Sequence, residues 1–188
     1  MEQNYLDSIR KQFLYYKSLG ERSMAQVPDE ALFWQYNEAS NSIAIVVKHL
    51  WGNMLSRWTD FLKSDGEKEW RDREGEFVGD IPDRAALMEK WNAGWACLFE
   101  ALDTVGEKEV MQMIYIRNMG HTVVEAINRQ MTHYAYHVGQ IVYIARMVQD
   151  QDWQSLSIPK GGTAAYNARQ FAKPKRREHY LDNMKPEA

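Results

Sequence analysis

The spacing of hydrophobic residues along the chain predicts four long helices. Apolar side chains recur at intervals of three and four over residues 3–23, 43–61, 83–105 and 123–149. This is the period of an amphipathic helix that buries one face. The chain is therefore expected to fold mainly by packing these four apolar faces together.

Capping residues and turn formers indicate where these helices begin. Ser40 or Asn41 can cap the second helix, and Pro82-Asp83 opens the third. Thr122 followed by Glu125 has the spacing of a capping box, which places the start of the fourth helix after Thr122. Residues 28–34 are expected to form a short helical turn, and the β-prone residues 110–117 an extended segment or a short hairpin.

The segment between the second and third helices is the longest connection. Residues 67–80 are charged, include two glycines and show no periodicity. This length suits a crossover better than a tight turn between neighbouring helices. We therefore predict an all-α fold, a four-helix bundle with a long crossover connection, over residues 1–170. Residues 171–188 are expected to be a basic tail (KPKRR at 173–177) that is solvated, disordered or in contact with a partner.

Length and charge narrow the class of protein further. The chain has 188 residues, enough for one domain, and a net charge of −3, which does not favour nucleic acid or an anionic membrane. A single cysteine, Cys97, excludes an intramolecular disulfide. There is no signal peptide and no apolar run of membrane-spanning length, so a cytoplasmic location is expected.

The placement of the histidines carries the chemical information. His133 and His137 stand at i and i+4 in the fourth predicted helix, where two side chains share a face and can bind one metal ion. On a helical wheel both lie about 80° to 120° from the centre of the apolar stripe. In the second helix, His49 and Asn53 have matching offsets. Two helices thus carry polar residues on corresponding edges of their apolar faces, as an internal polar pocket requires.

An ordinary structural role is the alternative for these histidines. Each could be a boundary residue that hydrogen-bonds a neighbour, and the wheels do not decide between the two. His121 precedes His133 by twelve residues, about 18 Å along a helix, so the two cannot share an ion if the helix includes both. His121 is expected at the start of the fourth helix, and His179 in the solvated tail.

The chain resembles the DinB-like superfamily of bacterial metal-binding four-helix bundles, of which the YfiT-like proteins are part. The resemblance rests on one histidine in NSIAIVVKHLWGNMLSRWTDFL and on HxxxH followed by GQI in HTVVEAINRQMTHYAYHVGQIVYIARM. The later segment SIPKGGTAAYN is similar to a subfamily of unassigned function. The resemblance implies that His49, His133 and His137 bind a divalent metal ion, which could be zinc, nickel, manganese or iron. Asn53 and Gln140 are candidates to hydrogen-bond the ligands or a water, or else ordinary boundary residues.

The resemblance also suggests three functions. Related bacillithiol transferases and mycothiol-dependent maleylpyruvate isomerase imply transfer of a low-molecular-weight thiol to an electrophile, with the metal lowering the pKa of the thiol. The first alternative is metal-assisted hydrolysis of an amide or ester. The second is a non-enzymatic metal-binding or stress-response protein. No carboxylate near the histidines is evident as a general base, and a homodimer is expected from the resemblance.

Overall fold

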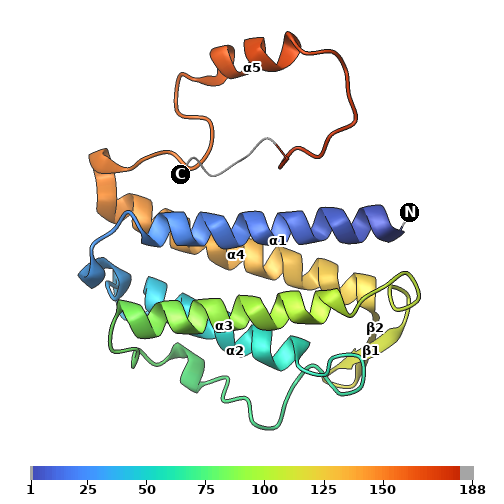
Figure 1. Ribbon diagram of the computed structural model, residues 1–188. Helices are drawn as coiled ribbons and strands as arrows, with labels where there is room; N and C mark the ends of the chain where they lie inside the picture. The colour runs from blue at the N-terminus through green and yellow to red at the C-terminus, as the bar shows by residue number, and fades with distance from the viewer. Residues whose placement is uncertain (1, 183–188) are drawn as a thin grey trace.

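The computed structural model describes residues 2–182 and is mostly helical (Figure 1). Its elements, in chain order, are α1 (Glu2–Met24), η1 (Asp29–Leu32), α2 (Ile43–Trp58), η2 (Gly75–Phe77), α3 (Arg84–Asp103), β1 (Met113–Ile116), β2 (Met119–Thr122), α4 (Val123–Gln149), η3 (Asp150–Asp152) and α5 (Thr163–Phe171). In Figure 1, α1 and α3 lie in front of α4 and α2. The most extensive contacts join α2 to α3 and α1 to α4, and α2 also packs on α4.

The helix boundaries follow the local signals with one error at a cap. Thr122 and Glu125 form the predicted capping box at the start of α4, and Asp83 caps α3. The predicted cap of α2 at Ser40 or Asn41 is wrong, because the Oγ of Ser42 accepts the hydrogen bond from the Ile45 backbone N–H at 3.2 Å. The helix also ends earlier than its apolar pattern suggested, since Asp60 adopts a φ of 48° just beyond it.

The segment before α4 is a β-hairpin, one of the two alternatives that its β-prone residues allowed. Strands β1 and β2 are antiparallel, and Ile114 is paired with His121. Ile114 and Ile116 are buried against the helices, whereas the other two residues of β1 are exposed. The hairpin therefore covers one end of the helices, and His121 lies just before α4 as expected.

Aromatic side chains fill much of the core. Phe13, Trp91, Trp95 and Tyr134 are almost fully buried, and the rings of Trp95 and Tyr134 are 5.9 Å apart in an edge-to-face arrangement. The hydroxyl of Tyr134 accepts a hydrogen bond from Trp58 Nε1 at 2.9 Å and donates to Asn53 Oδ1 at 3.2 Å. These two hydrogen bonds link α4 to α2 and help to align the two helices that carry the histidines.

The C-terminal part of the chain folds back over α1. Helix α5, which the hydrophobic pattern did not predict, has no buried residue and lies apart from the long helices in Figure 1. Beyond it, His179 Nε2 lies 3.0 Å from the Oγ of Ser8, and Lys11 pairs with Asp182 at 2.5 Å. The described part of the basic tail thus contacts α1. Among the described residues, no helix has the length and apolar character needed to cross a membrane.

Candidate metal centre

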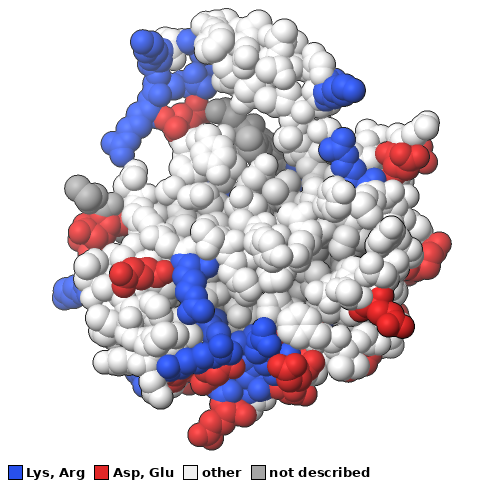
Figure 2. All heavy atoms as spheres, turned by 180° about the vertical axis from the view of Figure 1, so that it is seen from behind, with Lys and Arg blue, Asp and Glu red and all other residues white. Residues whose placement is uncertain are grey.

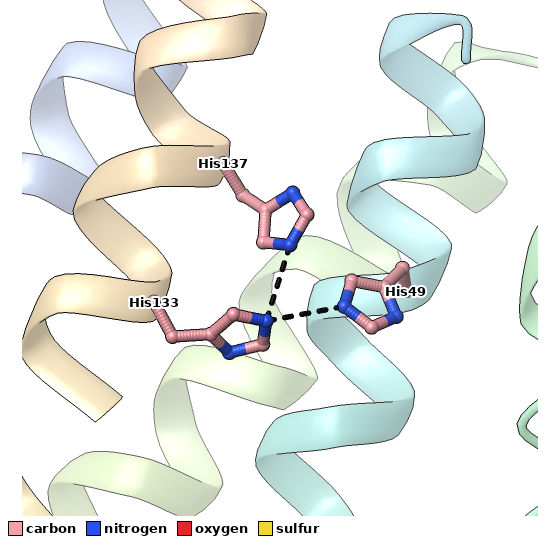
Figure 3. Close-up of side chains that lie close together, drawn as sticks. All are labelled: His49, His133 and His137. Atoms are coloured by element: carbon pink, nitrogen blue, oxygen red, sulfur yellow. Dashed lines mark hydrogen bonds between the residues drawn. The ribbon is translucent and has the colours of Figure 1, made fainter. Parts of the chain in front are cut away.

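Three histidines from two helices lie together between α2 and α4. His49 comes from α2 and His133 and His137 from α4, and in Figure 3 their rings point toward one another. The Nε2 atom of His133 is 3.3 Å from that of His49 and 3.1 Å from that of His137. The three histidines that the sequence singled out thus lie close enough to hold a metal ion. Neither His121 nor His179 belongs to this cluster.

In His49 and His137, Nε2 faces the cluster, and Nδ1, on the other side of the ring, has a hydrogen-bond partner of its own. The Nδ1 of His49 is 2.9 Å from Glu76 Oε2, and that of His137 is 2.8 Å from Gln140 Oε1. A carboxylate and an amide oxygen can only accept, so each Nδ1 carries the proton and donates it. In the neutral rings, both Nε2 atoms then present lone pairs toward Nε2 of His133.

The donor atoms of the cluster therefore fit a cation. A neutral His133 can donate one Nε2–H at most, so at least one of the two close nitrogen pairs is left without a hydrogen bond. A cation between the nitrogens would accept the lone pairs that this arrangement leaves unpaired. Zinc–nitrogen bonds of about 2.0–2.1 Å in a tetrahedral site would separate the nitrogens by about 3.3 Å, close to the two distances found.

Burial keeps the imidazoles of His133 and His137 neutral. Burial, together with the neighbouring His137 and His49, lowers the pKa of His133 to about 3. Burial also lowers the pKa of His137, although its hydrogen bond with Gln140 acts in the other direction. The neutral form is the one that binds metals, so the site is prepared for a cation at neutral pH.

Glu76 is the residue that the sequence did not reveal. It is 4% exposed and lies in η2, within the crossover connection. Its Oε1 accepts from Arg71 Nε at 2.7 Å, and its Oε2 accepts from Arg71 Nη2 at 3.0 Å and from His49. Phe77, the next residue, stacks on the His49 ring at 5.0 Å. The connection thus folds against α2 and fixes the orientation of His49.

A glycine in α2 makes this close approach possible. At Gly52, one turn beyond His49, a Cβ atom would overlap the carboxylate of Glu76. The absence of a side chain at this position lets the crossover reach the helix. Gly52 is thus needed for the contact between Glu76 and His49.

The two polar residues singled out beside the histidines take different positions. Gln140 contacts His137, as described above. Asn53 makes no hydrogen bond with the three histidines, and its Oδ1 accepts from Tyr134. Asn53 does line a cavity of about 550 Å³ that the three histidines also line. It is therefore placed to meet a molecule in this cavity.

Fold and cluster together define a helical protein with a three-histidine site that faces a cavity. The chain belongs to the family described as "Protein of unknown function (DUF1572)", whose model matches residues 1–162. No curated protein and no solved structure matches the chain. The family match covers the three histidines and Glu76, and ends before α5.

Proposed function

We propose that this protein is a divalent-metal enzyme that transfers a low-molecular-weight thiol to an electrophile, with His49, His133 and His137 as the metal ligands. The observation that carries the proposal is the convergence of three Nε2 atoms beside a cavity, two of them with lone pairs fixed inward by Glu76 and Gln140. Three protein ligands leave positions for a further ligand, which is the form of a catalytic site. Zinc, nickel, manganese and iron all accept imidazole nitrogen.

We also propose that the architecture is a DinB-like four-helix bundle with a long crossover. The pairwise packing of α1 with α4 and of α2 with α3, together with the long connection from α2 to α3, supports this assignment. In that superfamily the metal ligands come from the helices that correspond to α2 and α4. The expected homodimer is part of the same proposal.

The residues of the chain prepare the site for nucleophilic transfer. A divalent ion held by the histidines would supply a Lewis acid that lowers the pKa of a thiol and so favours the reactive thiolate. The thiol proton passes to water, the sulfur forms a bond with the electrophilic carbon, and the leaving group departs with the electrons of the broken bond. Among the described residues that line the cavity there is no Asp or Glu, so no carboxylate base is at hand. Thiol transfer needs none once the thiol is acidic, whereas hydrolysis usually gains from one.

The proposal is tested first by metal content. The protein, purified without a histidine tag, is expected to contain close to one equivalent of a divalent metal by mass spectrometry. The His133→Ala/His137→Ala variant should lose it, whereas His179→Ala, outside the cluster, should keep it. A wild-type protein that stays free of metal after incubation with zinc, nickel and manganese would overturn the proposed site.

Activity then separates the reactions. The metal-loaded protein is assayed with monochlorobimane and a panel of thiols such as cysteine and glutathione, and with p-nitrophenyl esters in the absence of thiol. Metal-dependent conjugation that the double histidine variant lacks supports thiol transfer. Ester cleavage alone would identify a hydrolase instead. A metal-loaded protein that catalyses neither reaction would favour a non-enzymatic metal-binding protein.

A further inference from the structure

The cavity beside the histidines is lined by an unusual number of arginines. They come from α2, the crossover connection, the hairpin turn and α4, and they are Arg57, Arg71, Arg73, Arg117 and Arg129. The described lining has no acidic residue to balance them. In a chain with a net charge of −3, this concentration of positive charge is a local feature. Figure 2 shows Lys and Arg side chains gathered in the lower part of the rear face, beside a few Asp and Glu side chains.

Two of these arginines, Arg57 and Arg71, are buried and stabilise the fold through ion pairs. The side chains of Arg57 and Arg71 are 6% and 2% exposed, and both form ion pairs with Glu67, at 2.9 Å and 3.2 Å. Arg71 also binds Glu76. These buried guanidinium groups are compensated by Glu67 and Glu76, which do not line the cavity. They hold the crossover in place and are not free to bind a ligand.

The other three arginines are exposed and only weakly paired. Arg129 on α4 forms no ion pair with any described residue. Arg73 pairs with its neighbour Glu74, which is 89% exposed, and Arg117 is a third partner of Glu67 at 3.2 Å. The exposed Arg73–Glu74 pair contributes little free energy and is readily exchanged for a better partner. Arg117 shares Glu67 with two buried arginines, so this single carboxylate does not neutralise it.

One of the exposed arginines is nevertheless held at the histidines. The guanidinium of Arg73 lies over the ring of Phe77, 5.5 Å from its centroid, and the same ring stacks on that of His49. Phe77 thus links a positively charged side chain to a residue of the proposed metal site. A ligand that reaches the histidines from the cavity lies within the field of this arginine.

We propose that Arg73, Arg117 and Arg129 bind an anionic group of the substrate, a carboxylate or a phosphate, while another part of the same molecule reaches the three histidines. This inference rests on the proposed function, because it assigns the substrate class of the same site. Guanidinium groups pair with both anions through two parallel hydrogen bonds. The site thus selects substrates that carry an anion beside the reacting atom and discriminates against neutral ones of the same size.

The test measures anion binding without relying on the metal or on turnover. The full-length protein is stripped with a chelator, dialysed, and titrated with phosphate and, separately, with succinate by calorimetry. The titrations are repeated with Arg129→Gln and Arg73→Gln, which are exposed positions where a substitution leaves the fold intact. Arg146→Gln is the matched control, since it removes the same charge from the exposed surface of α4, far from the cavity lining.

We expect one of the two anions to bind the stripped protein, and its identity tells a carboxylate from a phosphate site. Arg129→Gln or Arg73→Gln should weaken binding about 10- to 100-fold, the range for a lost hydrogen-bonded charge pair, and Arg146→Gln less than about 2-fold. Two results would overturn the inference: no binding of either anion to the stripped protein, or equal losses in Arg73→Gln, Arg129→Gln and Arg146→Gln. Because the stripped protein is used, the anion site can be supported even if the protein binds no metal. Equally, the metal site can be supported even if no anion binds.

Discussion

Glu76 holds His49 from the side of the ring that faces away from the other two histidines. Its Oε2 is 2.9 Å from His49 Nδ1, while Arg71 donates to both of its oxygens. Burial would raise the pKa of Glu76, but hydrogen bonds from His49 and Arg71 outweigh it and lower that pKa. Glu76 therefore stays ionised and orients the imidazole. It is not among the residues that line the cavity, so it is not placed to take a proton from a substrate there.

Replacing this carboxylate should weaken metal binding. Glu76→Gln keeps the shape of the side chain but removes the charge that polarises His49, and loss of such an orienting partner typically lowers metal affinity about 10- to 100-fold. The affinity for zinc is measured by competition with a chromophoric chelator. Glu74→Gln is the control, because Glu74 is a nearby carboxylate that is almost fully exposed. Equal affinities in the wild type and Glu76→Gln would contradict the role assigned to Glu76.

A methyl group at Gly52 should disturb the same contact. In Gly52→Ala the new Cβ would overlap the Glu76 carboxylate, so the crossover must move away from α2. We expect a loss of about 1–3 kcal/mol in the free energy of unfolding, typical of overpacking, together with weaker metal binding. Chemical denaturation and the chelator competition measure the two effects.

Gly139→Ala is the matched control for Gly52→Ala. Gly139 also lies in a helix, two residues after His137, but nothing lies within 4 Å of the position its Cβ would take. Alanine there should stabilise α4 by about 0.5–1 kcal/mol through its better helix propensity. If both substitutions stabilised the protein, the close approach of Glu76 to α2 would be disproved.

The sequence was sufficient to single out the three histidines and Gln140, the partner of His137, but not Glu76, the partner of His49. His49, His133 and His137 lie on long helices whose apolar stripes fix the direction of every side chain, so a wheel placed them at one polar seam. Gln140 is linked to His137 by the same helical geometry. Local periodicity also predicted the four long helices and the capping box at Thr122.

Glu76 and the arginines of the cavity could not be found in this way. Glu76 lies 27 residues after His49 in a segment without periodicity, and its contact depends on the path of the crossover and on the space at Gly52. The five arginines come from different elements that only tertiary packing brings together. Charged residues in a connection are usually solvated, so the sequence gives no signal that these border a cavity.

The hydroxyl of Tyr134 should contribute to the stability of the site region. It is fully buried and links Trp58 Nε1 to Asn53 Oδ1. Tyr134→Phe keeps the ring and leaves both polar groups without this partner, which should lower the free energy of unfolding by about 1–3 kcal/mol. Denaturant titration checks the value, with Tyr143→Phe as the control, because Tyr143 lies exposed on the same helix. Equal stability of the two variants would show that water or a neighbour replaces the hydroxyl.

Acidification should destabilise the metal-free protein through His133. Its pKa of about 3 in the fold lies below the usual value of 6.5, so between these two pH values the unfolded chain binds the proton more readily than the folded one. The free energy of unfolding is therefore expected to be highest above pH 6.5 and to fall as the pH is lowered toward 3. The lowered pKa of His137 acts in the same direction.

Thermal unfolding of the chelator-stripped protein is followed from pH 7.5 to 4. His133→Gln, which cannot titrate, should lose less stability over this range than the wild type. An identical pH dependence in both proteins would show that other groups cause the acid sensitivity and that His133 is not held neutral by the fold.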